Sequence, residues 1–112
     1  MAAPTEITAF FWETAGVLLA NPAVSQSTMM GFPCLRVDGD FFASVNPRTG
    51  ELVVKLSATR VEALIANGVG ITFAPNGRRF REWVTILGRD PEQWRTFINE
   101  AHAFVAGQRH QA

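Results

Sequence analysis

The pattern of apolar and polar residues is clearest over residues 34–56, where alternation predicts three antiparallel strands joined by two turns. For the first turn we favour a three-residue loop over residues 37–39 rather than a two-residue turn, because the longer loop keeps Arg36 off the apolar face. Proline and glycine at the two ends of residues 47–50 fit a type I second turn. The resulting sheet has an apolar face and a mixed face. The apolar face comprises Leu35, Phe41, Ala43, Val45, Leu52, Val54 and Leu56, and the mixed face comprises Arg36, Asp40, Phe42, Ser44, Val53 and Lys55.

Apolar residues at helical spacing predict three helices, over residues 4–20, 58–67 and 91–106. Ser57 and Asp90 are favourable N-cap residues, and Gly107 is a stop signal for the last helix. The other segments are a polar connection at 23–28, two further strands at 69–74 and 80–87, and a frayed tail at 107–112. The order is α-β-β-β-α-β-β-α. We therefore expect one α+β domain over residues 1–112, with a core of about residues 5–106 and an antiparallel sheet of about four to five strands with terminal helices.

Composition narrows the classes of function. The formal net charge is zero, which argues against strong non-specific binding to nucleic acid or anionic membrane. The single cysteine, Cys34, cannot form a disulfide within the chain and suits a reducing compartment, so we expect a cytoplasmic protein. No stretch approaches the roughly 20 apolar residues that span a bilayer. Histidines, cysteine and carboxylates show no metal-ligand spacing, and we expect no metal, cofactor or membrane partner.

Three segments carry a family resemblance. Met30 and Gly31, residues 37–43 (VDGDFFA) and residues 52–56 (LVVKL) resemble the N-terminal domain of TfoX-type competence regulators. Residues 78–86 (RRFREWVTI), followed by a final helix, resemble the related MmcQ/YjbR proteins. The resemblance implies a small bacterial α+β domain, described as DNA-binding or regulatory, with no established catalytic residues. Phe32 and Pro33 stand where the TfoX pattern has its second glycine, and we expect no second domain of a full-length TfoX regulator.

Arg78, Arg79 and Arg81 form the basic cluster of the sequence, here called the arginine loop. On a loop beside a strand, these side chains would reach phosphates while Phe80 and Trp83 stack on bases. The alternative is a solvated loop with its aromatic residues in the core. Three or four phosphate contacts give only weak, salt-sensitive binding, so any DNA binding is expected to be weak.

The mixed face offers a second candidate site. Lys55, opposite Phe42 and flanked by Arg36 and Ser44, would bind an acidic ligand, and a half-buried lysine is also a candidate nucleophile. Trp83 belongs with this candidate ligand or partner face. The alternative is that the lysine stem covers an aromatic ring while its head stays in water.

The remaining candidate residues give weaker evidence of a site. Cys34 would act as a nucleophile only if the fold brings it to His102, and a buried inert thiol is the alternative. Asp38 and Asp40 are explained by turn chemistry. A surplus of apolar residues favours homodimerisation or binding to another protein; it comprises Met29, Met30, Phe32, Phe11 and Trp12.

The leading hypothesis is a non-enzymatic, cytoplasmic regulatory or binding module that uses the arginine loop and the mixed face. One alternative is a protein-interaction module or homodimer that binds no nucleic acid. Another is a binder of small acidic ligands, or an enzyme, that uses Lys55 and Arg36.

Overall fold

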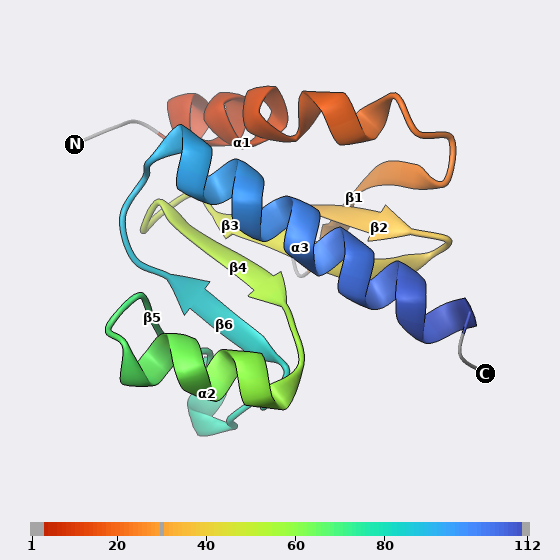
Figure 1. The fold of residues 1–112 in the computed structure, drawn as a ribbon. Helices are drawn as coiled ribbons and strands as arrows, with labels where there is room; N and C mark the ends of the chain where they lie inside the picture. The colour runs from red at the N-terminus through yellow and green to blue at the C-terminus, as the bar shows by residue number, and fades with distance from the viewer. Residues whose placement is uncertain (1–3, 30, 111–112) are drawn as a thin grey trace.

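In the part of the chain that the structure describes, a six-stranded antiparallel sheet carries three helices on one of its faces (Figure 1). The structure is a computed structural model that describes residues 4–29 and 31–110. In chain order the elements are α1 (Pro4–Leu19), β1 (Val24–Met29), β2 (Phe32–Val37), β3 (Asp40–Asn46), β4 (Glu51–Lys55), α2 (Ala58–Ala66), β5 (Gly70–Thr72), a 3-10 turn η1 (Pro75–Gly77), β6 (Trp83–Ile86) and α3 (Pro91–His110). The predicted α+β class is confirmed.

The strand order is β1-β2-β3-β4-β6-β5, so β6, the last strand in the sequence, lies between β4 and β5. The predicted pairings of Ala43 with Val54 and of Val45 with Leu52 are confirmed. Figure 1 shows α3 crossing the middle of the sheet, α1 beside it, and α2 beside β5 and β6. The buried core lies between these helices and one sheet face; it includes Leu35, Ala43, Val45, Leu52, Val54, Val84 and Ile86 from the strands and Phe11, Val61, Leu64, Trp94, Ile98 and Ala101 from the helices.

The turn between β2 and β3 differs from the one we expected. Val37 pairs with Asp40 across a two-residue turn, in which Asp38 and Gly39 have positive φ angles of 52° and 89°. Aspartate followed by glycine in this left-handed conformation makes the tight turn that matches the twist of paired strands. The predicted three-residue loop is therefore wrong.

A β-bulge beyond this turn sets which of two neighbouring phenylalanines faces the core. Arg36 pairs with Phe41 and Leu35 pairs with Ala43, so Phe42 is the extra residue on β3. Phe42 is fully buried in the core beneath the helices. Phe41 is half-buried and lies under the Arg36 guanidinium. The predictions that Phe41 faces the core and that Phe42 lies on the mixed face are both wrong, because the bulge shifts the alternation by one residue.

Two segments are more regular than the sequence indicated. Residues 23–28, expected to be a connection, contain β1, an edge strand that pairs with β2 and brings the sheet to six strands rather than four to five. Its serines, glutamine and threonine are mostly exposed, so they show no apolar alternation. α3 continues through Gly107 to His110, so the predicted stop at Gly107 is wrong. Residues 111–112 of the expected frayed tail, and Met30, lie outside the described residues.

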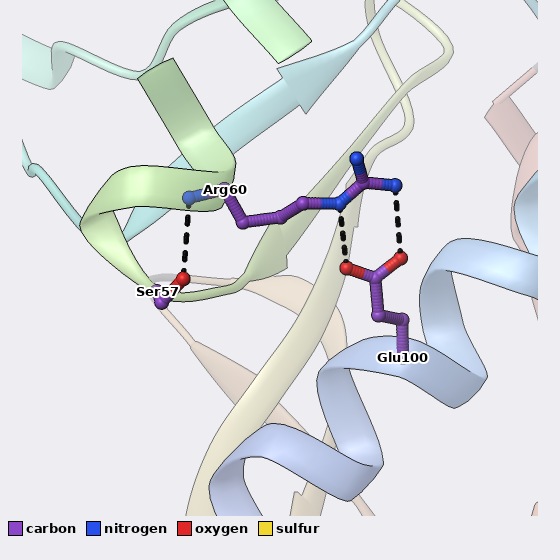
Figure 2. Close-up of polar contacts among 3 residues, drawn as sticks. All are labelled: Ser57, Arg60 and Glu100. Carbon is purple, nitrogen blue, oxygen red and sulfur yellow. Dashed lines mark hydrogen bonds and ion pairs between the residues drawn. The ribbon is translucent and has the colours of Figure 1, made fainter. Parts of the chain in front are cut away.

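Both predicted N-caps are present, and α2 is tied to α3 by an ion pair. The Ser57 hydroxyl accepts a hydrogen bond from the Arg60 N–H at 3.2 Å, and the Asp90 carboxylate accepts one from the Glu92 N–H at 3.0 Å. Figure 2 shows how the Arg60 side chain then reaches Glu100 of α3 with two hydrogen bonds, of 2.8 and 3.2 Å. The ion pair thus links α2 to α3 at the surface, while Val61 and Leu64 of α2 pack into the core on the same side of the sheet as the other helices.

Candidate binding cleft

A cleft of about 530 Å³ opens at the end of the sheet where β3 begins and β4 ends. Its walls come from the strands, from the loop between β5 and β6, and from the last turns of α3. These walls are formed by Gly39, Asp40, Phe41, Lys55 and Trp83 of the sheet and its first turn, Phe73, Pro75 and Phe80 of the loop, and Val105 and Gln108 of α3. The cleft therefore joins Phe80, which stands between the arginines of the arginine loop, to part of the predicted mixed face.

Sheet pairing places Trp83 next to Lys55. The two residues are partners in the β4–β6 ladder, and the N–H of Leu56 donates to the carbonyl of Glu82 at 2.9 Å just beyond it. Partners in a ladder project to the same face, so the indole and the lysine side chain share one wall. The Lys55 Nζ lies 4.0 Å from a carboxylate oxygen of Glu82, and both side chains are partly exposed.

The loop between β5 and β6 folds back on itself and supplies two more rings. The N–H of Phe80 donates to the carbonyl of Phe73 at 3.1 Å, and the N–H of Trp83 donates to the carbonyl of Phe80 at 3.3 Å. Between them Gly77 has a φ of 80°, a conformation that glycine adopts without strain. The Phe73 ring lies 5.8 Å from that of Phe80 and 6.3 Å from that of Trp83. The rings form a continuous aromatic wall that the backbone holds in place.

Cationic side chains border this wall. The Arg36 guanidinium lies 4.2 Å from the centre of the Phe41 ring, and its buried Nε has no hydrogen-bond partner among the described residues. The Arg78 guanidinium lies 5.5 Å from the Phe80 ring. Arg81 lines a shallower hollow of about 320 Å³ that shares Lys55, Phe80 and Trp83 with the cleft. Arg79 is exposed on the same loop.

Only part of the predicted mixed face reaches the cleft. Ser44 is buried and donates to the carbonyl of Pro33 at 2.9 Å. It lines a separate hollow of about 90 Å³, which shares only Phe73 with the cleft. Phe42 lies in the core, with its ring 5.5 Å from that of His102. The structure thus brings Lys55, Trp83 and the arginine loop together, keeps Arg36 adjacent through Phe41, and separates Ser44 and Phe42 from them.

Cys34 and His102 do not form a catalytic pair. Cys34 is the register partner of Ser44 and projects from the helix-free face, whereas His102 contacts Phe42 beneath the helices. Burial raises the pKa of the Cys34 thiol, against smaller opposing effects of the Ser27 hydroxyl and the Arg36 charge. A raised pKa keeps the thiol protonated and unreactive at neutral pH.

Residues 4–29 and 31–110 contain neither a cluster of metal ligands nor a helix able to span a membrane. Histidine, cysteine and carboxylate side chains of this part do not gather in groups of three or more that could hold a metal ion. None of its helices is long and apolar enough to cross a membrane.

Sequence reasoning missed more than half of the residues that line the cleft. Gly39, Phe73, Pro75, Val105 and Gln108 were not candidates, Phe41 was expected in the core, and Gln108 falls in the tail that we expected to fray. The one local signal of an aromatic loop is the pair Phe73 and Phe80, which flank a proline–glycine turn.

Comparison with known proteins bears on the resemblance noted above. No curated protein matches the chain, and no solved structure matches it. The family model described as YjbR matches residues 19–104, which include all six strands of the sheet and most of α3. The match spans the helix-covered sheet and most of the cleft walls, and it confirms the YjbR part of the resemblance. Because it covers well over half of the chain, the protein belongs to the YjbR family.

Proposed function

We propose that this domain is a non-catalytic module that binds unpaired nucleic-acid bases in the aromatic cleft. One observation carries the proposal. Four aromatic rings surround a single hollow of about 530 Å³, and guanidinium groups lie over two of them; the rings are Phe41, Phe73, Phe80 and Trp83. Rings stack on the face of any base, and cations beside them attract the backbone phosphates.

Single-stranded segments fit this site better than duplex. The rings line a recess, and a base reaches such a recess only when it leaves its stack. The cationic groups near the cleft are few, and the whole chain is neutral, so the electrostatic attraction to duplex phosphates is small. Stacking, at about 1–3 kcal/mol per base, therefore supplies most of the affinity.

We further propose a role and a cellular location for the module. A binding domain of this kind would act as a regulator, by occupying exposed single-stranded nucleic acid, rather than as an enzyme. We place it in the cytoplasm, a location that the single unpaired cysteine supports.

A second candidate function uses the same cleft for a small acidic ligand. The hollow has the size of small-molecule sites, and Lys55 supplies a cation on its wall. This candidate predicts that a mononucleotide or another planar acid raises the melting temperature and that Lys55→Ala abolishes the shift.

Fluorescence anisotropy of labelled single-stranded and duplex oligonucleotides, at low and physiological salt, tests the proposal. We expect the single strand to bind more tightly than the duplex, with a salt slope of about −2, the value for roughly three neutralised phosphates. Trp83→Ala and Phe80→Ala should each weaken binding by about tenfold or more with little change in the salt slope. The triple variant R78A/R79A/R81A should lower both the affinity and the slope.

Arg48→Ala is the matched control, because it removes one exposed arginine from the turn at the opposite end of β3 and β4. It should bind as the wild type does. Equal, negligible binding of single strand and duplex by all the proteins would overturn the proposal, and tighter binding of duplex would overturn its single-strand form.

A further inference from the structure

β1, a strand of six residues, stands at one edge of the described sheet, and its outer side has no neighbouring strand. Among residues 4–29 and 31–110, β1 pairs with β2 alone, and β5 at the other edge of the sheet has only three residues. The N–H of Asp38 donates to the carbonyl of Ala23 at 2.9 Å, which makes these two residues a hydrogen-bonded pair. Bonded and non-bonded pairs alternate along an antiparallel ladder. The next bonded positions on β1 are therefore Ser25 and Ser27, whose backbone groups point to β2.

The backbone groups of Val24, Gln26 and Thr28 consequently point away from the sheet. The N–H of Val24 is already used, since it donates to the carbonyl of Asn21 at 3.0 Å. Pro33, which has no N–H, is the partner of Thr28 at a position where none is directed at β1. Gln26 lies at the centre of the outward set and is exposed.

This edge lacks the features that keep strands of soluble proteins apart. Charges, prolines and bulges commonly protect an open edge. The sequence of β1, VSQSTM, has no charge and no proline, and its register with β2 is unbroken. The neutral stretch extends further, because no charged residue occurs between Glu13 and Arg36.

α1 adds an apolar ridge above the same edge. α1 packs on both β1 and α3, and its Phe10 contacts Trp94 of α3 at 4.9 Å. Trp12 is about 200° around the helix from Phe10, so it lies on the side of α1 away from α3. Leu19, two turns further on, lies on that side as well. Both side chains are only half-buried, which leaves apolar surface beside the open strand.

We propose that the β1 edge pairs with the β1 edge of a second copy of this chain. In antiparallel register, Gln26 pairs with Gln26 of the second copy, and Val24 pairs with Thr28 of the second copy. A twofold axis through the Gln26 pair then matches every outward position of the strand with another outward position. A second copy suits this edge for two reasons. The neutral stretch offers no charge that a charged partner could recognise, and two copies of the stretch do not repel each other. The Trp12 sides of the two α1 helices meet above the joined strands.

Analytical ultracentrifugation over an approximately hundredfold concentration range tests the pairing. The wild-type mass should rise from 12.3 kDa towards twice that value. Gln26→Lys places like charges opposite each other across the axis, so it should weaken association by about tenfold or more. Gln26→Glu gives the same charge conflict with almost no change in shape and covers the case in which the lysine variant fails to fold.

Thr72→Lys is the matched control, because it adds one charge to the exposed end of the opposite edge strand β5. It should associate as the wild type does. The proposal is overturned if the wild type stays monomeric over the whole range, if both Gln26 variants dimerise unchanged, or if Thr72→Lys dissociates the dimer equally.

Discussion

The guanidinium carbon of Arg36 lies 4.2 Å from the centre of the Phe41 ring, on the face of the sheet opposite the neighbouring Phe42. The bulge in β3 decides which of the two rings is buried, because it places Phe42 on the same helix-covered face as Ala43 and so turns Phe41 to the other face. Phe42 becomes part of the core and Phe41 becomes part of the cleft. Two identical side chains adjacent in sequence thus have different roles, one in stability and one in the cleft, and each role can be measured separately.

Phe42→Ala should lower the free energy of unfolding by about 3–5 kcal/mol, because it leaves a cavity beneath the helices. Phe41→Ala should lower it by less than about 1.5 kcal/mol, since its ring is only half-buried, and should instead weaken oligonucleotide binding. Urea unfolding followed by circular dichroism measures the first quantity and anisotropy the second. Phe42→Leu, a milder core change, covers the case in which the alanine variant does not fold. Similar stability losses for the two alanine variants would contradict the bulge assignment.

Two glycines should respond in opposite directions to alanine. A Cβ on Gly70 would lie 2.6 Å from Cγ2 of Val84 and 3.0 Å from the carbonyl oxygen of Thr85, so Gly70→Ala should destabilise the protein by about 1–3 kcal/mol. Gly16 lies inside α1 with open space around it, and Gly16→Ala should stabilise the protein by up to about 1 kcal/mol. Thermal unfolding of both variants checks the signs. A stabilising Gly70→Ala would mean that β5 and β6 are not in close contact there.

The elements that the sequence predicted well are those set by local chemistry. Ser57 and Asp90 cap the helices that follow them, and the turn before Gly50 aligns β3 with β4 as expected. Each of these features depends on residues a few positions apart, whose preferences act wherever the segment lies.

The elements that it predicted poorly depend on distant partners. β1 is recognisable only from its pairing with β2, because its residues are polar and exposed. The bulge depends on how Phe42 packs under α3, which no local pattern specifies. Most of the cleft follows from the insertion of β6 beside β4, which brings Trp83 and the arginine loop to Lys55. Sequence reasoning found these residues separately but could not place them in one site.

The ion pair between Arg60 and Glu100 should contribute little to stability despite its two hydrogen bonds. Its side chains are 43% and 34% exposed, and exposed pairs contribute about 0.2–1 kcal/mol. The hydrogen bond to the Glu100 carboxylate raises the pKa of Arg60, so the guanidinium stays charged. A double-mutant cycle with Arg60→Gln and Glu100→Gln measures the coupling, which should fall as salt is added. A coupling that does not depend on salt would argue against the exposed pair seen in Figure 2.

Cys34 should react slowly with thiol reagents at neutral pH, because burial keeps it protonated. Its raised pKa also links stability to pH. Below the usual value of 9.0 the thiol is protonated in both states, whereas above it only the unfolded state loses the proton, so stability falls as pH rises. The fall should be smaller in Cys34→Ala, and comparison of the two proteins by urea unfolding isolates the cysteine. Rapid labelling of the native protein, relative to the urea-unfolded control, would contradict this prediction.

Pairing of two β1 edges should make binding to long single strands bivalent. A twofold axis perpendicular to the joined sheets leaves the helices of both copies on one side, and it turns the sheet residues of both clefts (Phe41, Lys55 and Trp83) to the other side. One strand can then occupy both clefts, and the second contact is made at a high effective concentration. A single strand of roughly 40 nucleotides should therefore bind the wild type at least about tenfold more tightly than one of roughly 8, beyond the statistical gain from additional sites. Gln26→Lys should bind the short strand as the wild type does and lose the gain for the long one, whereas Trp83→Ala should lose both. An equal length effect in Gln26→Lys would show that the two clefts do not act together.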